Sequence, residues 1–107
     1  MMEINGRDIT VSRGDTLVIS FNAAGVNLKD ARATFTVKRT PESTRPEIVE
    51  QMTIEEGGRL SLKVPAETMR HVSPGTYVYD ILVEDTDGRI TLNFPARFEV
   101  IGVVHSA

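Results

Sequence analysis

Cysteine and tryptophan are both absent from this sequence of 107 residues. The missing cysteine excludes disulfide bonds, a thiolate metal site and a cysteine nucleophile. A chain of this length matches one ordinary domain, so we expect residues 1–107 to form a single domain held together by burial of apolar side chains alone. The absence of disulfides also fits assembly in the cytosol.

Long apolar runs and an excess of basic residues are missing as well. No stretch approaches the roughly 20 apolar residues that a membrane-spanning helix needs, and the first residues do not have the pattern of a signal peptide. Lys and Arg total 12 against 15 Asp and Glu, which gives a net charge of -3. Nucleic-acid-binding domains usually carry a clear basic excess. We therefore expect neither a membrane nor a nucleic acid as a partner.

Residues with catalytic chemistry are sparse. Histidine occurs only as His71 and His105, and the sequence contains neither a Gly-x-Ser-x-Gly nor a His-Glu-x-x-His motif. The glycine pair at residues 57–58 precedes a strand pattern, whereas a phosphate-binding loop precedes a helix. We expect no enzyme activity, no catalytic residue, no cofactor and no metal.

Alternation of apolar and polar residues dominates what is present. Such alternation is typical of antiparallel strands with one face buried and the other exposed to solvent. The clearest runs cover residues 16–21, 32–38, 59–64, 76–84 and 89–100, with weaker strands expected over residues 8–11 and 47–54. About seven short strands separated by turn residues predict an all-β antiparallel sandwich.

Two prolines and a short apolar pattern add detail to this prediction. Residues 65–71 fit one helical turn, with Pro65 near its start and Met69 pointing inward. Pro95 has no N–H to donate to a sheet, so the last strand is expected to lie at an edge or to be bulged at this residue.

The stretch Gly75-Thr76-Tyr77-Val78-Tyr79 indicates which kind of sandwich is present. Immunoglobulin-type sandwiches often have a Gly-x-Tyr-x-Cys sequence at this point, in which the tyrosine hydroxyl bonds back to the backbone at a corner. Here Tyr79 replaces the cysteine, and both tyrosines share the inward parity. We interpret them as structural residues of an immunoglobulin-like fold that lacks the disulfide.

Two surface motifs resemble known binding motifs, but the formation of a turn alone explains their residues. The sequence DTDG at residues 85–88 places acidic residues together, but it fails the calcium-loop pattern of the EF-hand, which leaves only a weaker surface calcium site near Asp85 and Asp87 as an alternative. Arg13-Gly14-Asp15 spells an integrin-binding tripeptide. It also supplies what a turn between two strands needs.

The outward parity of residues 76–84 is half apolar, and the segment after the last strand is apolar as well. Apolar surface of this kind often marks a contact with another protein, although packing within the chain is an equal alternative. The candidate interaction surface comprises Val78, Asp80, Leu82, Ile101, Val103 and Val104.

The sequence SPGTYVYDI at residues 73–81, followed by DTDGRI at residues 85–90, resembles small immunoglobulin-like domains of tailed-bacteriophage and prophage virion proteins. The start of the chain at residues 13–19 is similar to the opening of the same group. The resemblance implies a structural or assembly protein of the tail, baseplate or head that contacts other virion proteins, forms homo-oligomers and is assembled in the bacterial cytoplasm. Related proteins often continue beyond the sandwich into a receptor-binding region, and this chain ends soon after it.

A bacterial surface or carbohydrate-binding module with the same fold is the alternative function. Sugar-binding modules usually stack ligands on exposed aromatic rings. All six aromatic residues of this chain lie on an inward parity, which argues against a stacking platform.

Overall fold

A computed structural model describes residues 2–23 and 25–105, with only the backbone described at Asn5, Phe94 and Pro95. Nine strands and one short helix make up this part of the chain. They are β1 (Met2–Asn5), β2 (Asp8–Ser12), β3 (Leu17–Asn22), β4 (Arg32–Lys38), β5 (Ile48–Gln51), β6 (Thr53–Glu55), β7 (Arg59–Val64), α1 (Ala66–Met69), β8 (Gly75–Glu84) and β9 (Arg89–Ile101).

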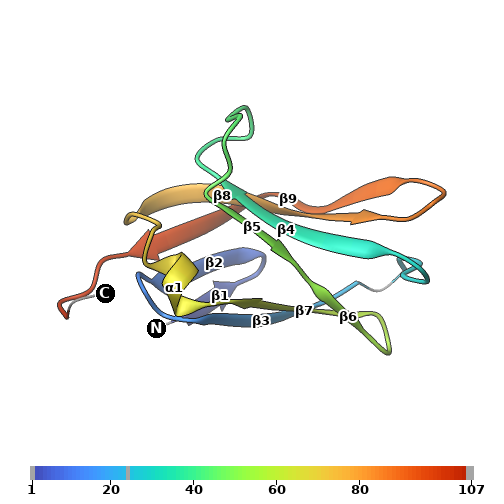
Figure 1. The fold of residues 1–107 in the computed structure, drawn as a ribbon, viewed down its shortest axis with the longest axis horizontal. Coiled ribbons are helices and arrows are strands. Elements are labelled where there is room, and N and C mark those ends of the chain that lie inside the picture. The colour runs from blue at the N-terminus through green and yellow to red at the C-terminus, as the bar shows by residue number, and fades with distance from the viewer. Residues whose placement is uncertain (1, 24, 106–107) are drawn as a thin grey trace.

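The strands form two sheets that pack face to face (Figure 1). The larger sheet has the order β1-β2-β9-β8-β4-β5, and the smaller sheet has the order β3-β7-β6. The pairing of β2 with β9 is parallel, and the other pairings are antiparallel. The predicted all-β sandwich is confirmed.

The alternating residues fill the space between the sheets. Leu17, Leu60 and Val64 of the smaller sheet are fully buried, and they belong to the same apolar cluster as side chains of the larger sheet. The ring of Phe35 lies at the centre of this cluster, with its centroid 5.2 Å from that of Tyr79 and 6.0 Å from that of Phe98. The period of two therefore predicts the buried face of each long strand.

Both tyrosines of β8 are buried and use their hydroxyl groups locally. The Tyr77 hydroxyl donates to the carbonyl of Ser73 at 2.6 Å, four residues upstream. The Tyr79 hydroxyl donates to the carbonyl of Arg7, and it accepts a bond from Asn93 Nδ2 at 3.3 Å. The predicted inward position of the two tyrosines is confirmed.

Residues 47–54 form two strands instead of the one strand that we predicted. The chain leaves the larger sheet after β5 and enters the smaller sheet at β6, with Met52 buried at the crossing. The Met52 N–H donates to the Ala33 carbonyl at 2.9 Å and fixes the crossing point. Strand β1 was not predicted either, so the described chain has nine strands where the sequence predicted about seven.

The other local predictions hold with one refinement. Helix α1 spans Ala66–Met69, and Met69 is fully buried. Strand β9 pairs with β2 only over Phe98–Ile101, and among the described strands its earlier residues pair with β8 alone. Its register with β8 also shifts between Tyr79 and Ile81, so Pro95 lies both in an edge segment and in a bulge. Asn93 sits in this bulge with a φ of 58°, a conformation that asparagine tolerates better than most residues.

Candidate interaction surface

Val78, Asp80 and Leu82 lie on the outer face of β8, near the middle of the larger sheet. All three side chains are half-buried, although no second layer covers this face. On one side they face β4, where Leu82 pairs with Thr34, Asp80 with Thr36 and Val78 with Lys38. The burial comes from these neighbours and from the loop after β4, so the predicted apolar stripe on the outer face exists.

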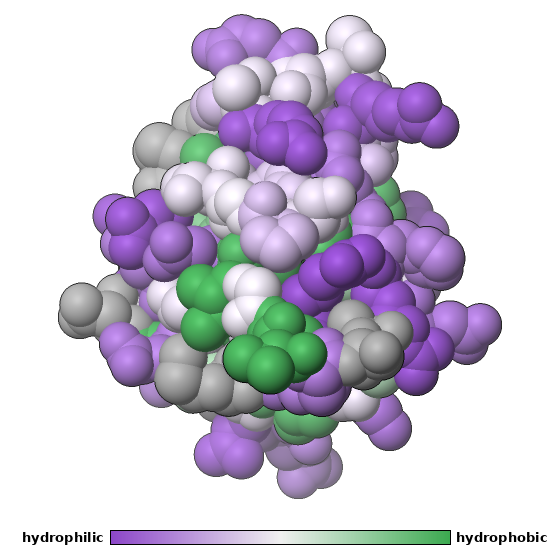
Figure 2. Space-filling model, turned by 90° about the vertical axis from the view of Figure 1, so that its left-hand side faces the viewer, coloured by the Kyte–Doolittle hydropathy of each residue, from purple (hydrophilic) through white to green (hydrophobic). Residues whose placement is uncertain are grey.

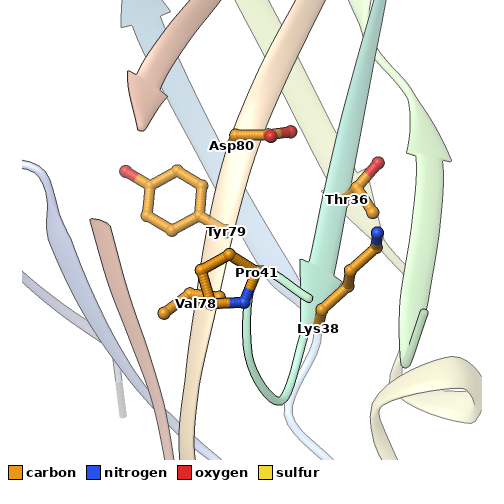
Figure 3. A pocket seen from close by; sticks show the side chains of 6 residues that line it. All are labelled: Thr36, Lys38, Pro41, Val78, Tyr79 and Asp80. Carbon is orange, nitrogen blue, oxygen red and sulfur yellow. The ribbon is translucent and has the colours of Figure 1, made fainter. Parts of the chain in front are cut away.

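The loop at residues 39–47, which joins β4 to β5, rises from the sheets beside this stripe (Figure 1). Together with the strands it borders a small hollow of about 50 Å³, lined by Thr36, Lys38, Pro41, Val78, Tyr79 and Asp80. Figure 3 shows Pro41 close to Val78, and it shows the Asp80 and Tyr79 side chains leaving β8 in opposite directions. The hollow is therefore mixed in character, with apolar groups, the Thr36 hydroxyl, the Lys38 ammonium and the Asp80 carboxylate in its walls.

Asp80 lies opposite the β9 bulge. Its neighbours Tyr79 and Ile81 have partners in β9, but the register shift leaves Asp80 without one. Burial raises the pKa of Asp80 above its ordinary value, and the positive charge of Lys38 opposes this rise. Among the described residues the Asp80 side chain makes neither a hydrogen bond nor an ion pair within 4.0 Å, so its charge is only partly compensated.

Several charged side chains on this outer face lie in ion pairs. Glu84 lies 3.9 Å from Arg32 and 3.6 Å from Arg89 at the strand ends, and Arg97 lies 3.5 Å from Glu99 within β9. Exposed pairs of this kind contribute little to stability. Their position matters more here, because Val78 lies between Lys38 and Arg97, whereas Leu82 lies between Thr34 and Thr91. A less charged centre inside a polar rim is the usual anatomy of a protein interface.

The candidate residues at the end of the chain lie elsewhere. Ile101 is the last residue of β9, and its carbonyl accepts a bond from the Arg13 N–H at 2.9 Å. Ile101 and Val103 are half-buried, whereas Val104 is fully exposed. The end of the molecule to which this segment runs shows a small group of apolar side chains among hydrophilic ones (Figure 2).

The two groups of candidate residues do not form one compact site. Val78 pairs with Arg97, which precedes Ile101 by four residues in the same strand. At about 3.3 Å per residue, four residues separate the two groups by about 13 Å along β9. The stripe on β8 has the more defined geometry, so it is the better candidate for a specific contact.

The surface motifs form parts of turns. Asp85 Oδ1 accepts bonds from the N–H groups of Asp87 at 2.7 Å and Gly88 at 3.0 Å, which closes the turn between β8 and β9. The Arg13 guanidinium donates to the Arg70 carbonyl at 3.1 and 3.3 Å, so this side chain is held against the segment after α1. Within residues 2–23 and 25–105, no three His, Asp or Glu side chains lie together as a metal site requires.

The sequence analysis missed the residues that β4 and its loop contribute. Thr36 and Lys38 have the outward parity of their strand, so the alternation itself could have placed them on an outer face. What it could not show is that β4 pairs with β8, because this pairing joins residues forty or more positions apart. Among the described residues, no helix has the length and apolar character that crossing a membrane requires.

Comparisons with known proteins assign no function to this surface. No family model matches the sequence, and no curated protein matches it. Among solved structures, the chain is similar to the 1.4 Å crystal structure of an uncharacterized protein from Bacillus anthracis str. Ames, with 12% sequence identity and a TM-score of 0.45. The similarity covers 88% of this chain and 76% of the other.

Proposed function

We propose that this chain is an immunoglobulin-like structural or assembly protein of a bacteriophage or prophage particle, and that it works by binding other virion proteins. The resemblance of residues 73–81 to virion immunoglobulin-like domains is the origin of this proposal. The most specific part of the resemblance is the Tyr-x-Tyr-Asp-Ile stretch at residues 77–81, and the fold and the surface add physical support.

The strand pairing supports the immunoglobulin-like part of the proposal. Immunoglobulin sandwiches place strands B, E and D in one sheet and strands C, F and G in the other, and variable-type domains add C′ beside C. The order β3-β7-β6 matches B-E-D, and the order β9-β8-β4-β5 matches G-F-C-C′. The bond from the Tyr77 hydroxyl to the Ser73 carbonyl corresponds to the tyrosine corner at the start of strand F.

One observation on the surface supports binding to a protein. Val78 and Leu82 flank Asp80, whose charge is only partly compensated, on an outer face where Glu84 is paired with Arg32 and Arg89, and Arg97 with Glu99. A partner that covers this stripe would bury apolar surface and could offer Asp80 a hydrogen-bond donor or a cation. Localisation in the virion, after assembly in the bacterial cytoplasm, is part of this proposal.

The aromatic rings argue against the carbohydrate-binding alternative. Phe35, Tyr77, Tyr79 and Phe98 are at most 2% exposed, and Phe21 is partly buried against the core. The Phe94 side chain lies outside what the structure describes. Stacking on a sugar requires an exposed ring face, and none of the five described rings offers one.

The test is the composition of purified particles. A bacterium that encodes the chain is induced to produce phage, and the particles are separated on a density gradient and quantified by mass spectrometry. We expect the chain at a fixed ratio to the tail or head proteins. Particles without the chain, together with an unchanged particle yield after deletion of its gene, would overturn the proposal.

A pair of variants tests whether the β8 face makes the contact. Leu82→Lys places a charge in the centre of the stripe, whereas Thr53→Lys places the same charge on the exposed surface of the other sheet. We expect Leu82→Lys to lower incorporation into particles at least tenfold and Thr53→Lys to leave it unchanged, since a buried unpaired charge costs several kcal/mol. Equal incorporation of both variants would exclude this face as the contact.

A further inference from the structure

Among the described residues, four strands have one edge unpaired along their whole length, and one of the four lacks the usual protection against pairing with another chain. The edges are β1 and β5 in the larger sheet and β3 and β6 in the smaller sheet. Natural proteins keep edge strands short, or place charges or prolines in them. Strands β1, β5 and β6 have three or four residues each, and each contains a glutamate. Strand β3 has six residues, LVISFN, without charge or proline.

The hydrogen-bond pattern shows which backbone groups of β3 are open. The Ala23 N–H donates to the Gly58 carbonyl at 2.8 Å, directly after the pairing of Asn22 with Arg59. In an antiparallel pair, hydrogen-bonded and non-hydrogen-bonded positions alternate. The backbone groups of Leu17, Ile19 and Phe21 therefore point to β7, and those of Val18, Ser20 and Asn22 point to the open edge.

These three residues are also accessible. Val18, Ser20 and Asn22 are exposed, and Val18 retains 60% of its accessible surface. The chain crosses between the sheets at Met52 on the opposite side, from β5 to β6, so the edge of β3 lies on the side away from this crossing. Among the described residues, strand β3 thus offers another strand three alternate residues whose N–H and C=O groups have no backbone partner.

We propose that β3 pairs with β3 of a second copy of this chain, antiparallel and around a two-fold axis at Ser20. In this register Ser20 faces Ser20 of the second copy, and Val18 faces Asn22. Each facing position exchanges two backbone bonds, so three positions supply about six hydrogen bonds. The pairing joins the two three-stranded sheets into one continuous sheet of six strands.

The chemistry of β3 selects a second copy as the occupant. In a two-fold symmetric contact, a residue on the axis faces the same residue of the second copy. A charged side chain near the axis would therefore repel the identical side chain of that copy. Strand β3 has no charge to repel, whereas Glu3, Glu50 and Glu55 oppose the same pairing at the other edges. The β3 edge belongs to the smaller sheet, so this contact is separate from the β8 face of the proposed function.

Charge variants at the axis test the proposal with purified protein. Light scattering and sedimentation are expected to show a concentration-dependent dimer of the natural chain. Ser20→Lys and Ser20→Glu each place like charges opposite one another and are expected to weaken the dimer at least tenfold. Mixing the two variants pairs opposite charges and is expected to restore it. Ser61→Lys, one strand inward at the position that pairs with Ser20, is the matched control that leaves the dimer intact.

A cross-linking experiment gives an independent readout, because the natural chain has no cysteine. Under mild oxidation, Ser20→Cys is expected to form a disulfide dimer at least tenfold faster than Thr53→Cys on the opposite edge. A strict monomer up to about 1 mM, equal cross-linking of both cysteines, or failure of the lysine–glutamate mixture to associate would overturn the proposal. None of these outcomes tests whether the β8 face itself binds another protein.

Discussion

Replacing Tyr79 by phenylalanine tests how the sandwich is locked together. Its hydroxyl joins three segments that are distant in sequence: β8, the turn between β1 and β2 at Arg7, and the β9 bulge at Asn93. Tyr79→Phe removes both hydrogen bonds and keeps the ring, whose packing against Phe35 and Phe98 is unchanged. The substitution therefore isolates the contribution of the hydroxyl group.

The expected loss follows from the two bonds. A typical intramolecular hydrogen bond contributes about 1 kcal/mol net, and the bond from Asn93 is long at 3.3 Å, so the free energy of unfolding falls by about 1–2 kcal/mol. Unfolding entropy is about 2.1 cal/mol/K per residue, or about 225 cal/mol/K for 107 residues. The melting temperature is therefore expected to fall by about 4–9 °C.

Thermal and urea unfolding measure this loss, with Tyr77→Phe as the matched control. The Tyr77 hydroxyl makes one bond, at 2.6 Å to the Ser73 carbonyl, so its removal is expected to cost about 1 kcal/mol, at or below the loss for Tyr79. A Tyr79→Phe protein within about 0.3 kcal/mol of the natural chain would refute this reasoning, because removing two bonds at a buried hydroxyl cannot be neutral.

The pH dependence gives a second measure of the same residue. Burial raises the pKa of Tyr79 above the ordinary tyrosine value of 10.0. The neutral tyrosine is thus favoured in the folded state, and its contribution is complete below pH 10 and is lost as the pH rises through the folded-state pKa. We expect the stability advantage of the natural chain over Tyr79→Phe to narrow above about pH 10. A constant difference between pH 8 and 11 would contradict the burial of this hydroxyl.

Three further predictions concern the surface and the turns. Burial raises the pKa of Asp80, so the neutral form of this side chain is favoured in the folded state. Asp80→Asn is therefore expected to raise the melting temperature at pH 7 and to lose this advantage below the unfolded-state pKa of 3.8. The opposite trend in a pH series of thermal melts would contradict this prediction. Asp85→Ala removes the acceptor of two hydrogen bonds in the turn and is expected to lower the free energy of unfolding by about 1 kcal/mol. The melting temperature of the natural chain is expected to be the same with added calcium and with a chelator. A higher melting temperature with calcium would show a cation site. Gly57 has a φ of +83°, whereas Gly88 has no positive φ and has open space around it. Gly57→Ala is therefore expected to destabilise the chain by about 1 kcal/mol, and Gly88→Ala is expected to be neutral. Equal urea midpoints for the two variants would show that backbone conformation does not matter at Gly57.

Local sequence information predicted the faces of the strands well. The alternation at residues 76–84 placed Tyr77, Tyr79 and Ile81 in the core and Val78 and Asp80 on the outer face, as the structure has them. This works because successive side chains in a strand point to opposite faces whatever the strand pairs with. The buried Met69 and the irregularity near Pro95 were predictable for a similar reason, since each follows from the chemistry of a single residue or turn.

A single sequence does not show which strands pair with one another. The division at Met52 depends on which sheet receives each half of residues 47–54, and the apolar alternation is the same in both sheets. Strand β1 is short, and its Met2 and Ile4 are 41% and 45% exposed, so burial left little pattern to detect. The hollow beside Asp80 joins residues of β4, β8 and the loop at residues 39–47, which only the fold brings together.

The two proposed contacts use different sheets, and this separation has a functional consequence. The outer face around Val78 and Leu82 belongs to the six-stranded sheet, whereas β3 is the edge of the three-stranded sheet. Pairing through β3 therefore leaves both outer faces open, and each dimer presents two copies of the same binding surface. Two linked copies engage a repeated partner far more tightly than one, because the second contact forms within the same complex. Virion parts are built from repeated subunits, so a small chain with one modest surface gains most from dimerisation. Ser20→Lys should therefore reduce incorporation into particles even though the β8 face is intact.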